Sequence, residues 1–417
     1  MNAKLFNTKL KSLPLLIFLG CWFALFVFGK CEKDDNPDDG DDMMMVEDSI
    51  DAVTFEDTLR FANFNASMFR STEGSLINEL SGNSSGKTQK VAEIIQRTRP
   101  DVLALMEFDY DVANEALNLF QLNYLQVSQN GADTIQYQYS YAVVSNTGVL
   151  AEVDIDGNGT VSLPNDAYGF GNFPGQYAFA ILSKYPLDLD NIRSFQEFLW
   201  KDMPDALLPE KANGESYYSE AVLDVFRLSS KSHVDIPVKL PNDKTVHVLL
   251  SHPTPPVFDG AEDRNGKRNH DEIRLFADYI SDAEYLVDDN GVSGGLKSDD
   301  YFVIMGDLNA DPVDGDSYNS AVNQLLTHPN VNAEVALGSM IPSSEGGAEH
   351  NQGAGDMSDP AYDTSFFGLR TDYALPSKNF NVVDSGVFWP NTADSLSYLV
   401  ANEASSDHVL VWVDVKF

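Results

Sequence analysis

Cysteine is scarce in this sequence: among 417 residues only Cys21 and Cys31 are cysteines, and both lie near the N-terminus. No disulfide framework can therefore hold the body of the chain together. Basic residues are scarce as well, because 27 Lys and Arg stand against 64 Asp and Glu, a formal net charge of −37. A module that binds nucleic acid by neutralising many phosphates carries the opposite charge, so that class is excluded.

Several signatures of common protein classes are also absent. No Gly-x-Gly-x-x-Gly follows a strand, no serine elbow is present, and no Cys/His spacing fits zinc. Nucleotide-cofactor, serine-hydrolase and zinc-finger functions are therefore not indicated. What the chain does have is 43% apolar residues and 11% aromatic residues, which is enough for a large folded core.

The N-terminal residues 1–31 are typical of a secretory signal. Lysines precede an apolar run from Leu13 to Phe28, which is short for a membrane span and typical of a signal-peptide core. Cys31 follows this run closely, and the acidic residues after it resemble the tether of a bacterial lipoprotein. We predict export and lipidation of Cys31. Lipidation at Cys21 and a short uncleaved anchor are the alternatives.

Residues 32–52 are rich in acids, lack apolar periodicity and are predicted to be a disordered tether. The predicted location is an outer-membrane or cell-surface lipoprotein, otherwise a periplasmic or secreted protein. The lipid anchor is then the only expected membrane contact, and no protein partner is evident. Residues 53–417 show no internal repeat and no Pro-, Gly- or Ser-rich linker, which favours one catalytic α/β domain.

Within this body, apolar runs of strand length alternate with helical patterns. We predict helices at 88–98 and 269–286, and a hairpin turn at Pro241–Lys244. The predicted strands are 58–64, 102–106, 177–182, 234–239, 246–250, 301–305, 369–375 and 409–415. Hairpins together with helical crossovers indicate mixed sheets covered by helices.

Polar side chains collect where these strands end. If the last strand runs opposite to the others, all of them lie at one edge of the sheets, where α/β folds usually bind ligands. They are Asn65, Glu107, His252 and Asp307 after strands, and Asp407 and His408 before one. Carboxylates suit Mg²⁺ or Mn²⁺, and imidazoles move protons near neutral pH. The set therefore indicates a metal-dependent phosphoester hydrolase.

Five segments, in this order, resemble the endonuclease/exonuclease/phosphatase superfamily. They are Leu59 to Asn65 (LRFANFN), Pro100 to Glu107 (PDVLALME), Gly306 to Pro312 (GDLNADP), Thr371 to Tyr373 (TDY) and Ser406 to His408 (SDH). The resemblance covers the body from about residue 58 to the C-terminus. It implies a four-layer α/β sandwich, with two mixed β-sheets packed face to face and helices on both outer sides.

The resemblance also implies roles for individual residues. Asn65, Glu107 and Asp407 resemble the metal site, with Glu107 as the direct ligand. Asp307 resembles the carboxylate that orients or deprotonates the attacking water, and Asn309 the residue that holds the phosphate.

Two histidines complete the implied catalytic set. Asp372 resembles the partner that fixes the tautomer of His408. His252 is similar to the histidine that faces the leaving oxygen in the deoxyribonuclease-like branch. A Glu supports that histidine in the branch, and Gln176 is the nearest position here, which weakens His252 as a general acid.

Other segments carry possible ligand sites outside these motifs. Arg264, Arg268 and Asn269 belong to a basic segment that fits a phosphate clamp, or else they are helix-start residues paired with acids. Asp154, Asp156 and Asn158 resemble an EF-hand loop that lacks its final Glu, which predicts a Ca²⁺ site or a tight Asx-rich turn. The polar stretch 342–359 is expected to be a mobile lid or an exposed insertion.

The predicted function is hydrolysis of phosphodiester or phosphomonoester bonds outside the cytoplasm by metal-activated water. Candidate substrates are a phosphorylated small molecule, a phospholipid head group or nucleic acid. The alternatives are an extracellular nuclease and a surface binding module that has lost its chemistry. The retained acidic and histidine residues argue against the latter.

Overall fold

The computed structural model describes residues 58–350 and 357–417, which belong to one unit, Val53–Phe417. The predicted signal peptide, Cys31 and the whole acidic segment 32–52 fall outside the described residues, as does 351–356 of the polar stretch. Among the described residues, no helix is long and apolar enough to cross a membrane.

Two mixed β-sheets form the centre of this unit. The six-stranded sheet has the order β10-β11-β1-β2-β4-β3 and the five-stranded sheet the order β5-β6-β7-β8-β9. The strands of the first are β1 (Leu59–Met68), β2 (Val102–Phe108), β3 (Tyr139–Val143), β4 (Phe179–Ser183), β10 (Asn381–Val387) and β11 (Val411–Lys416). Those of the second are β5 (Arg193–Ser194), β6 (His233–Lys239), β7 (Thr245–Ser251), β8 (Tyr301–Asp307) and β9 (Asp372–Pro376).

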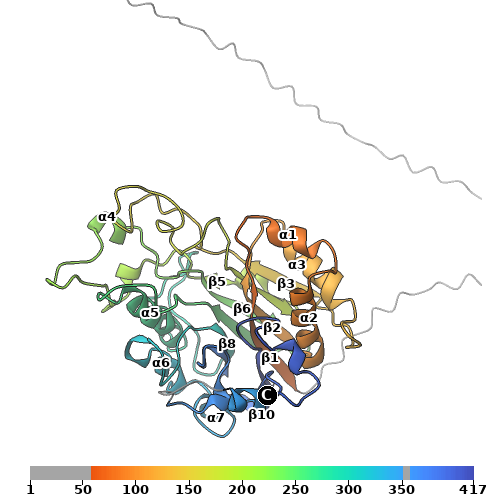
Figure 1. Cartoon of the computed structure of the whole chain (residues 1–417). Helices are drawn as coiled ribbons and strands as arrows, with labels where there is room; N and C mark the ends of the chain where they lie inside the picture. The colour runs from red at the N-terminus through yellow and green to blue at the C-terminus, as the bar shows by residue number, and fades with distance from the viewer. Residues whose placement is uncertain (1–57, 351–356) are drawn as a thin grey trace, which may run out of the picture. The chain divides into compact units, whose positions relative to one another are not determined.

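Helices cover the outer faces of both sheets. The α-helices are α1 (Ser75–Leu80), α2 (Gly86–Thr98), α3 (Glu115–Phe120), α4 (Glu220–Leu223), α5 (Arg264–Tyr279), α6 (Asn323–Leu326), α7 (Ala333–Ala336) and α8 (Glu345–Glu349). In Figure 1, α1, α2 and α3 lie on one side of the sheets, and α5 and α6 lie on the other. The predicted four-layer α/β sandwich is confirmed.

The alternation of side chains along β1 explains how the layers pack. Leu59 and Phe61 belong to the core shared with the second sheet, whereas Ala62 and Phe64 pack in the core beneath α2. Because side chains alternate between the two faces of a strand, Asn63 and Asn65 are on the same face as Phe61. This pattern turns both amides toward the second sheet.

Helix α2 agrees with its sequence signals. The Ser85 side chain caps the first turn by accepting a hydrogen bond from the Thr88 backbone N–H. Ile94 and Ile95 are buried, and the helix ends at Arg99, whose φ of 53° is left-handed, directly before Pro100. The predicted hairpin turn at Pro241–Lys244 is also confirmed, since it joins the antiparallel pair β6 and β7.

The second predicted helix was placed too late in the sequence. Helix α5 begins at Arg264 rather than 269, and it ends at Tyr279 rather than 286. The Asp259 carboxylate accepts the Asn265 backbone N–H at 2.7 Å, which stabilises the early start. At the other end, the Leu296 N–H donates to the Tyr279 carbonyl at 2.9 Å. A returning segment therefore takes over the backbone bonds that a longer helix would need.

Part of the predicted lid is ordered structure packed on the body. Residues Glu345–Glu349 form α8, which the Ser344 side chain caps. The Gly346 N–H donates to the Trp389 carbonyl at 2.9 Å, and the Ser344 N–H donates to the Ala361 carbonyl at 2.9 Å. The residues that precede 351–356 are thus held against neighbouring loops.

Candidate active site

Strand pairing brings two carboxylates of the site side by side. In the antiparallel pair of β8 and β9, Asp307 at the end of one strand lies opposite Asp372 at the start of the other. Both side chains are almost fully buried. Like charges at paired positions repel each other, so the arrangement requires a positive group between them.

His408 supplies that positive group. Its Nδ1 donates to Asp372 Oδ2 at 2.7 Å, and its Nε2 lies 3.7 Å from Asp307 Oδ2. Burial by itself lowers the pKa of His408, but the surrounding carboxylates, Asp372 and Asp307 foremost, outweigh it and raise the pKa to about 10. The ring is therefore an imidazolium at neutral pH, and it links the two carboxylates.

Asp372 is held by donors that the sequence did not reveal. Asn63 Nδ2 donates to its Oδ1 at 3.0 Å. The hydroxyls of Thr364 and Thr371 donate to its Oδ2 at 3.0 and 3.2 Å. Asn63 could have been found from its position two residues before Asn65, because residues i and i+2 share a strand face. The threonines gave no comparable signal.

Asp307 stands at the centre of the group. Its Oδ2 accepts from Asn65 Nδ2 at 3.0 Å, and its Oδ1 accepts from the Asn309 backbone N–H at 3.0 Å. Burial raises the pKa of Asp307 to about 6, against the opposing effect of the His408 charge. A carboxylate whose pKa lies nearer neutrality is a better general base than an ordinary aspartate.

His252 lies against the same carboxylate but is not charged. Its Nε2 is 3.5 Å from Asp307 Oδ2, and its buried Nδ1 has no hydrogen-bond partner among the described residues. Burial, together with the nearby charges of Lys231 and His408, holds the pKa of His252 well below its usual range. His252 is therefore a neutral imidazole at pH 7.

The expectation that Gln176 orients His252 is wrong. Gln176 Oε1 accepts from the Asn172 backbone N–H at 2.7 Å, and its Nε2 donates to the Arg70 carbonyl at 2.6 Å. The amide is thus used to join two loops. Its position before β4 suggested a contact that depends on loop geometry, which sequence spacing does not determine.

Glu107 and Asp407, two of the predicted metal ligands, line the same pocket as Asp307 and His408. Burial raises the pKa of Glu107 to about 7, and the carboxylates of Asp307 and Asp407 add to the rise. Glu107 also has a left-handed backbone, with a φ of 56°. Such strain is found where a fold must aim a side chain at a functional site. Carboxylate oxygens are ligands that Mg²⁺ and Mn²⁺ prefer, and metal binding by Glu107 and Asp407 stays a prediction.

Asn65 and Asn309 are hydrogen-bonded to Asp307. Asn65 Oδ1 accepts from the Ser67 backbone N–H at 3.1 Å, so its amide connects Asp307 with the turn after β1. Asn309 Nδ2 donates to the Pro253 carbonyl at 3.1 Å, next to His252. Asn65 as part of the metal site and Asn309 as a phosphate ligand stay predictions.

One pocket of about 1040 Å³ is lined by Glu107, His252, Asp307, Asn309, Asp407 and His408. This is at the upper end of the range for small-molecule sites. The pocket walls also carry aromatic rings. Phe170, Phe258 and Phe367 are 60%, 87% and 55% exposed, and Phe367 packs edge-on against His408 with ring centroids 5.2 Å apart.

The sequence profile described as "Endonuclease/Exonuclease/phosphatase family" matches residues 62–408. The chain belongs to the endonuclease/exonuclease/phosphatase family. Enzymes of this family hydrolyse phosphoester bonds in nucleic acids or phosphorylated compounds, typically with a divalent metal ion, and this chain is a hydrolase of that class. No curated protein matches the sequence.

Solved structures similar to this member of the endonuclease/exonuclease/phosphatase family are distant in sequence. One is an endonuclease/exonuclease/phosphatase from Beutenbergia cavernae, with 15% identity, a TM-score of 0.47, and coverage of 86% of this chain and 72% of that chain. The human Nocturnin catalytic domain has 14% identity, a TM-score of 0.41 and coverage of 86% and 93%. Beta toxin from Staphylococcus aureus has 16% identity, a TM-score of 0.41 and coverage of 85% and 99%.

The predicted phosphate clamp is only partly directed at the pocket. Arg264 lines the pocket, pairs with Glu262 and donates to the Phe258 carbonyl at 3.1 Å. The Arg268 guanidinium donates to three backbone carbonyls, at 2.7 to 2.9 Å. Asn269 is fully buried and joins the Thr254 and Leu308 carbonyls. These contacts support a role for Arg268 and Asn269 in holding loops, and phosphate binding by the three stays a prediction.

The EF-hand-like loop lies at the edge of the pocket, which Asp156 lines. Ligand atoms of Asp154, Asp156 and Asp166 lie within 4.8 Å of one another. Asp166, buried in the loop, stands beside the position where an EF-hand has its final Glu. In the side chain of Asn158, the third predicted ligand, Oδ1 accepts the Thr160 backbone N–H at 2.8 Å and Nδ2 donates to Asp156 at 2.9 Å. Calcium binding stays a prediction.

Proposed function

We propose that this chain is an exported, divalent-metal-dependent phosphoesterase that hydrolyses a small organic phosphoester by water attack. The observation that carries the proposal is the arrangement of Asp307, His408 and Asp372 beside the carboxylates of Glu107 and Asp407. A buried base, an imidazolium and oxygen ligands for a cation are together the groups that phosphoester hydrolysis requires.

Each residue has a task in the proposed mechanism. Glu107 and Asp407 would hold the cation, which when bound neutralises charge on the phosphoryl oxygens. Asp307 orients the attacking water and accepts its proton, while Asn65 and the Asn309 N–H fix the direction of the carboxylate.

The histidines act on the charge that builds up as the leaving group departs. His408 is an imidazolium held by Asp372, so it stabilises the negative charge of the transition state without first having to bind a proton. His252 is neutral, so it contributes a hydrogen bond rather than a charge.

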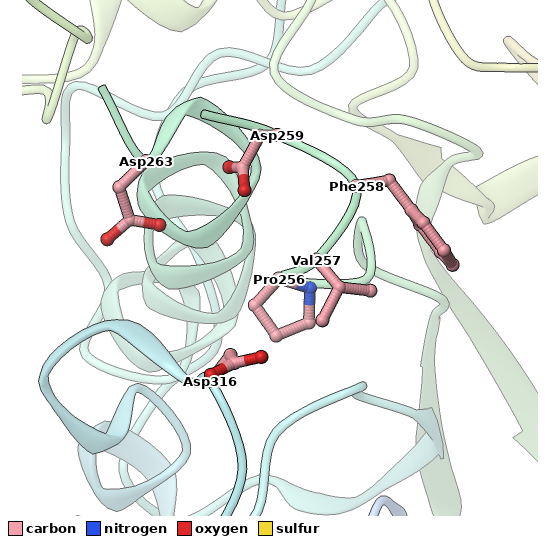
Figure 2. A pocket seen from close by; sticks show the side chains of 6 residues that line it. All are labelled: Pro256, Val257, Phe258, Asp259, Asp263 and Asp316. Carbon is pink, nitrogen blue, oxygen red and sulfur yellow. The ribbon is translucent and has the colours of Figure 1, made fainter. Parts of the chain in front are cut away.

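The charge around the pocket and its exposed aromatic rings support the proposal that the substrate is small. A cavity of about 360 Å³ adjoins the main pocket, and Figure 2 shows Asp259 and Asp263 beside α5 with Asp316 across from them. Acidic groups in the adjoining cavity repel a long polyanion such as duplex DNA. The exposed rings of Phe170, Phe258 and Phe367 instead favour an apolar or aromatic group attached to the phosphate.

The test is hydrolysis by the full chain with Mg²⁺, Mn²⁺ or Ca²⁺, each compared with chelator. The substrates are 4-nitrophenyl phosphate, bis(4-nitrophenyl) phosphate and linear duplex DNA. The proposal predicts metal-dependent cleavage of at least one nitrophenyl ester and little cleavage of DNA. Efficient DNA cleavage would instead favour the nuclease, and no cleavage of any substrate would contradict the proposal for small esters.

A further inference from the structure

A lysine lies in the wall of the active-site pocket, although no sequence motif pointed to it. Lys231 is only 7% exposed, and it lines the same pocket as Glu107, His252 and Asp307. It precedes β6, two residues before the strand begins at His233. A buried lysine in a chain of net charge −37 needs a physical explanation.

The Lys231 ammonium is poorly satisfied within the protein. Among the described residues its only hydrogen bond is a long one, 3.4 Å from Nζ to the Pro253 carbonyl. No carboxylate of the described residues lies within ion-pair distance of it. An ammonium has three N–H donors, and leaving them unpaired away from water is costly. Lys231 thus has donors available for a ligand.

The oxygen that Lys231 contacts also accepts a hydrogen bond from Asn309. Asn309 Nδ2 donates to the same Pro253 carbonyl at 3.1 Å. The Lys231 ammonium and the Asn309 amide therefore converge on one oxygen, next to His252. Asn309 is in turn bonded through its backbone to Asp307.

Glu272 holds in place both the segment that carries Lys231 and the segment that carries Pro253. Its carboxylate oxygens accept the Ser230 and Thr254 backbone N–H groups, both at 2.6 Å. Ser230 precedes Lys231, and Thr254 follows Pro253. Glu272 is fully buried and engaged with the backbone, so it positions the lysine rather than pairing with it.

Electrostatics agree with this geometry. Burial lowers the pKa of Lys231, while the charges of Glu272, Glu107 and Asp307 oppose the lowering. The neutral His252 supplies no positive charge on this side of the pocket. A phosphoryl group that approaches Asp307 and Glu107 meets negative charge, and Lys231 is placed to compensate for it.

We propose that Lys231 binds a phosphoryl oxygen of the substrate, adding a positively charged ligand beside Asn309. The inference rests on the proposed function for its role in catalysis, and it extends that function by naming a further substrate-binding residue. A bound phosphate satisfies the free N–H donors and keeps the lysine protonated. Charge-assisted hydrogen bonds of this kind are strong when they are shielded from water.

The experiment compares three variants of the full chain with the wild type. Lys231→Met keeps the length of the side chain and removes its charge, and Lys231→Arg keeps the charge. Lys239→Met, at the exposed far end of β6, is the matched control. The readouts are binding of inorganic phosphate by calorimetry in the presence of Mg²⁺, kcat/KM for the nitrophenyl esters, and Tm.

We expect Lys231→Met to weaken phosphate binding and to lower kcat/KM by about 10- to 100-fold. Its Tm should be unchanged or higher, because a poorly paired buried charge has been removed. Lys231→Arg should retain part of the phosphate affinity and part of kcat/KM. Lys239→Met should match the wild type in both.

Wild-type phosphate affinity and kcat/KM in Lys231→Met would overturn the inference, and so would equal losses in the Lys239→Met control. If Lys231→Met does not fold, Lys231→Gln is judged by the same phosphate affinity. Failure of the proposed function gives a different pattern. A wild type that hydrolyses neither ester but binds phosphate through Lys231 would leave the inference standing and contradict the function.

Discussion

At the residue scale, the account depends on two carboxylates that one imidazolium connects. Asp307 and Asp372 occupy paired positions on adjacent strands, and His408 bonds to one and lies 3.7 Å from the other. That Asp307 and His408 belong to one site was predictable from sequence because their motifs follow in order, and Asn63 could have been found from its spacing to Asn65. The support by Thr364 and the position of Lys231 were not predictable, because they depend on segments that meet only in the folded chain.

Asp372→Asn tests whether the His408 imidazolium must be held between the two carboxylates. The neutral amide no longer holds the imidazolium, so we expect kcat/KM to fall by about 10³-fold, within the usual range for loss of a group that stabilises transition-state charge. The side chain keeps its size, so Tm should change little. Asp384→Asn on exposed β10 is the control, and a variant at Asp372 that remains fully active would contradict the linkage.

His233 gives a prediction for stability against pH that does not involve the active site. Burial lowers the pKa of His233 to about 4, and its Nε2 has no hydrogen-bond partner among the described residues. Because the folded pKa is below the unfolded value, protonation favours unfolding. The stability that the neutral form of His233 adds to the folded state is fully present above about pH 6.5, and it is lost as the pH falls toward 4.

We therefore expect the free energy of unfolding to drop by about 3 kcal/mol between pH 6.5 and 4 because of this one residue. Urea unfolding across that range, compared between wild type and His233→Gln, measures the difference. A parallel pH dependence in the two proteins would show that His233 does not titrate in this way.

At the element scale, most buried strands were predictable and three edge strands were not. Strands β1, β2, β7 and β8 are mostly buried, and the sequence located each of them within a few residues. Strands β3, β5 and β10 were missed. They lie at the edges of the sheets, and β10 is largely exposed with polar residues, so no apolar pattern marks it.

The EF-hand-like loop carries the prediction at this scale. If Asp154, Asp156 and Asp166 bind calcium, saturating Ca²⁺ should raise Tm by about 2 °C, because a ligand that binds only the folded state stabilises it. Asp156→Ala should lose the shift. Glu107→Gln, which alters the predicted catalytic metal site, should keep it. A shift that disappears in Glu107→Gln instead would place the calcium at the active site.

At the scale of the whole molecule, the excess of acids and the N-terminal signals suggest where the enzyme works. A net charge of −37 favours solubility and repels polyanions, which agrees with a small substrate. Lipidation of Cys31 would hold the acidic chain at a membrane surface through its acyl chains alone.

Cys31→Ser tests the anchor. In a bacterial host that processes lipoproteins, the wild type should be recovered with the membrane fraction and labelled by radioactive palmitate. The variant should lose the label and enter the soluble fraction, whereas Cys21→Ser should behave as the wild type. Labelling that depends on Cys21 would move the lipidation site there.

The central claim is that Asp307 activates water for metal-dependent phosphoester hydrolysis. The most direct measurement is the rate of nitrophenyl phosphate and bis(4-nitrophenyl) phosphate hydrolysis by wild type and Asp307→Asn, with Mg²⁺ or Mn²⁺ and with chelator. The account predicts activity only in the wild type with metal, while the two proteins melt at similar temperatures. Equal activity in Asp307→Asn, or activity that persists in chelator, would contradict it.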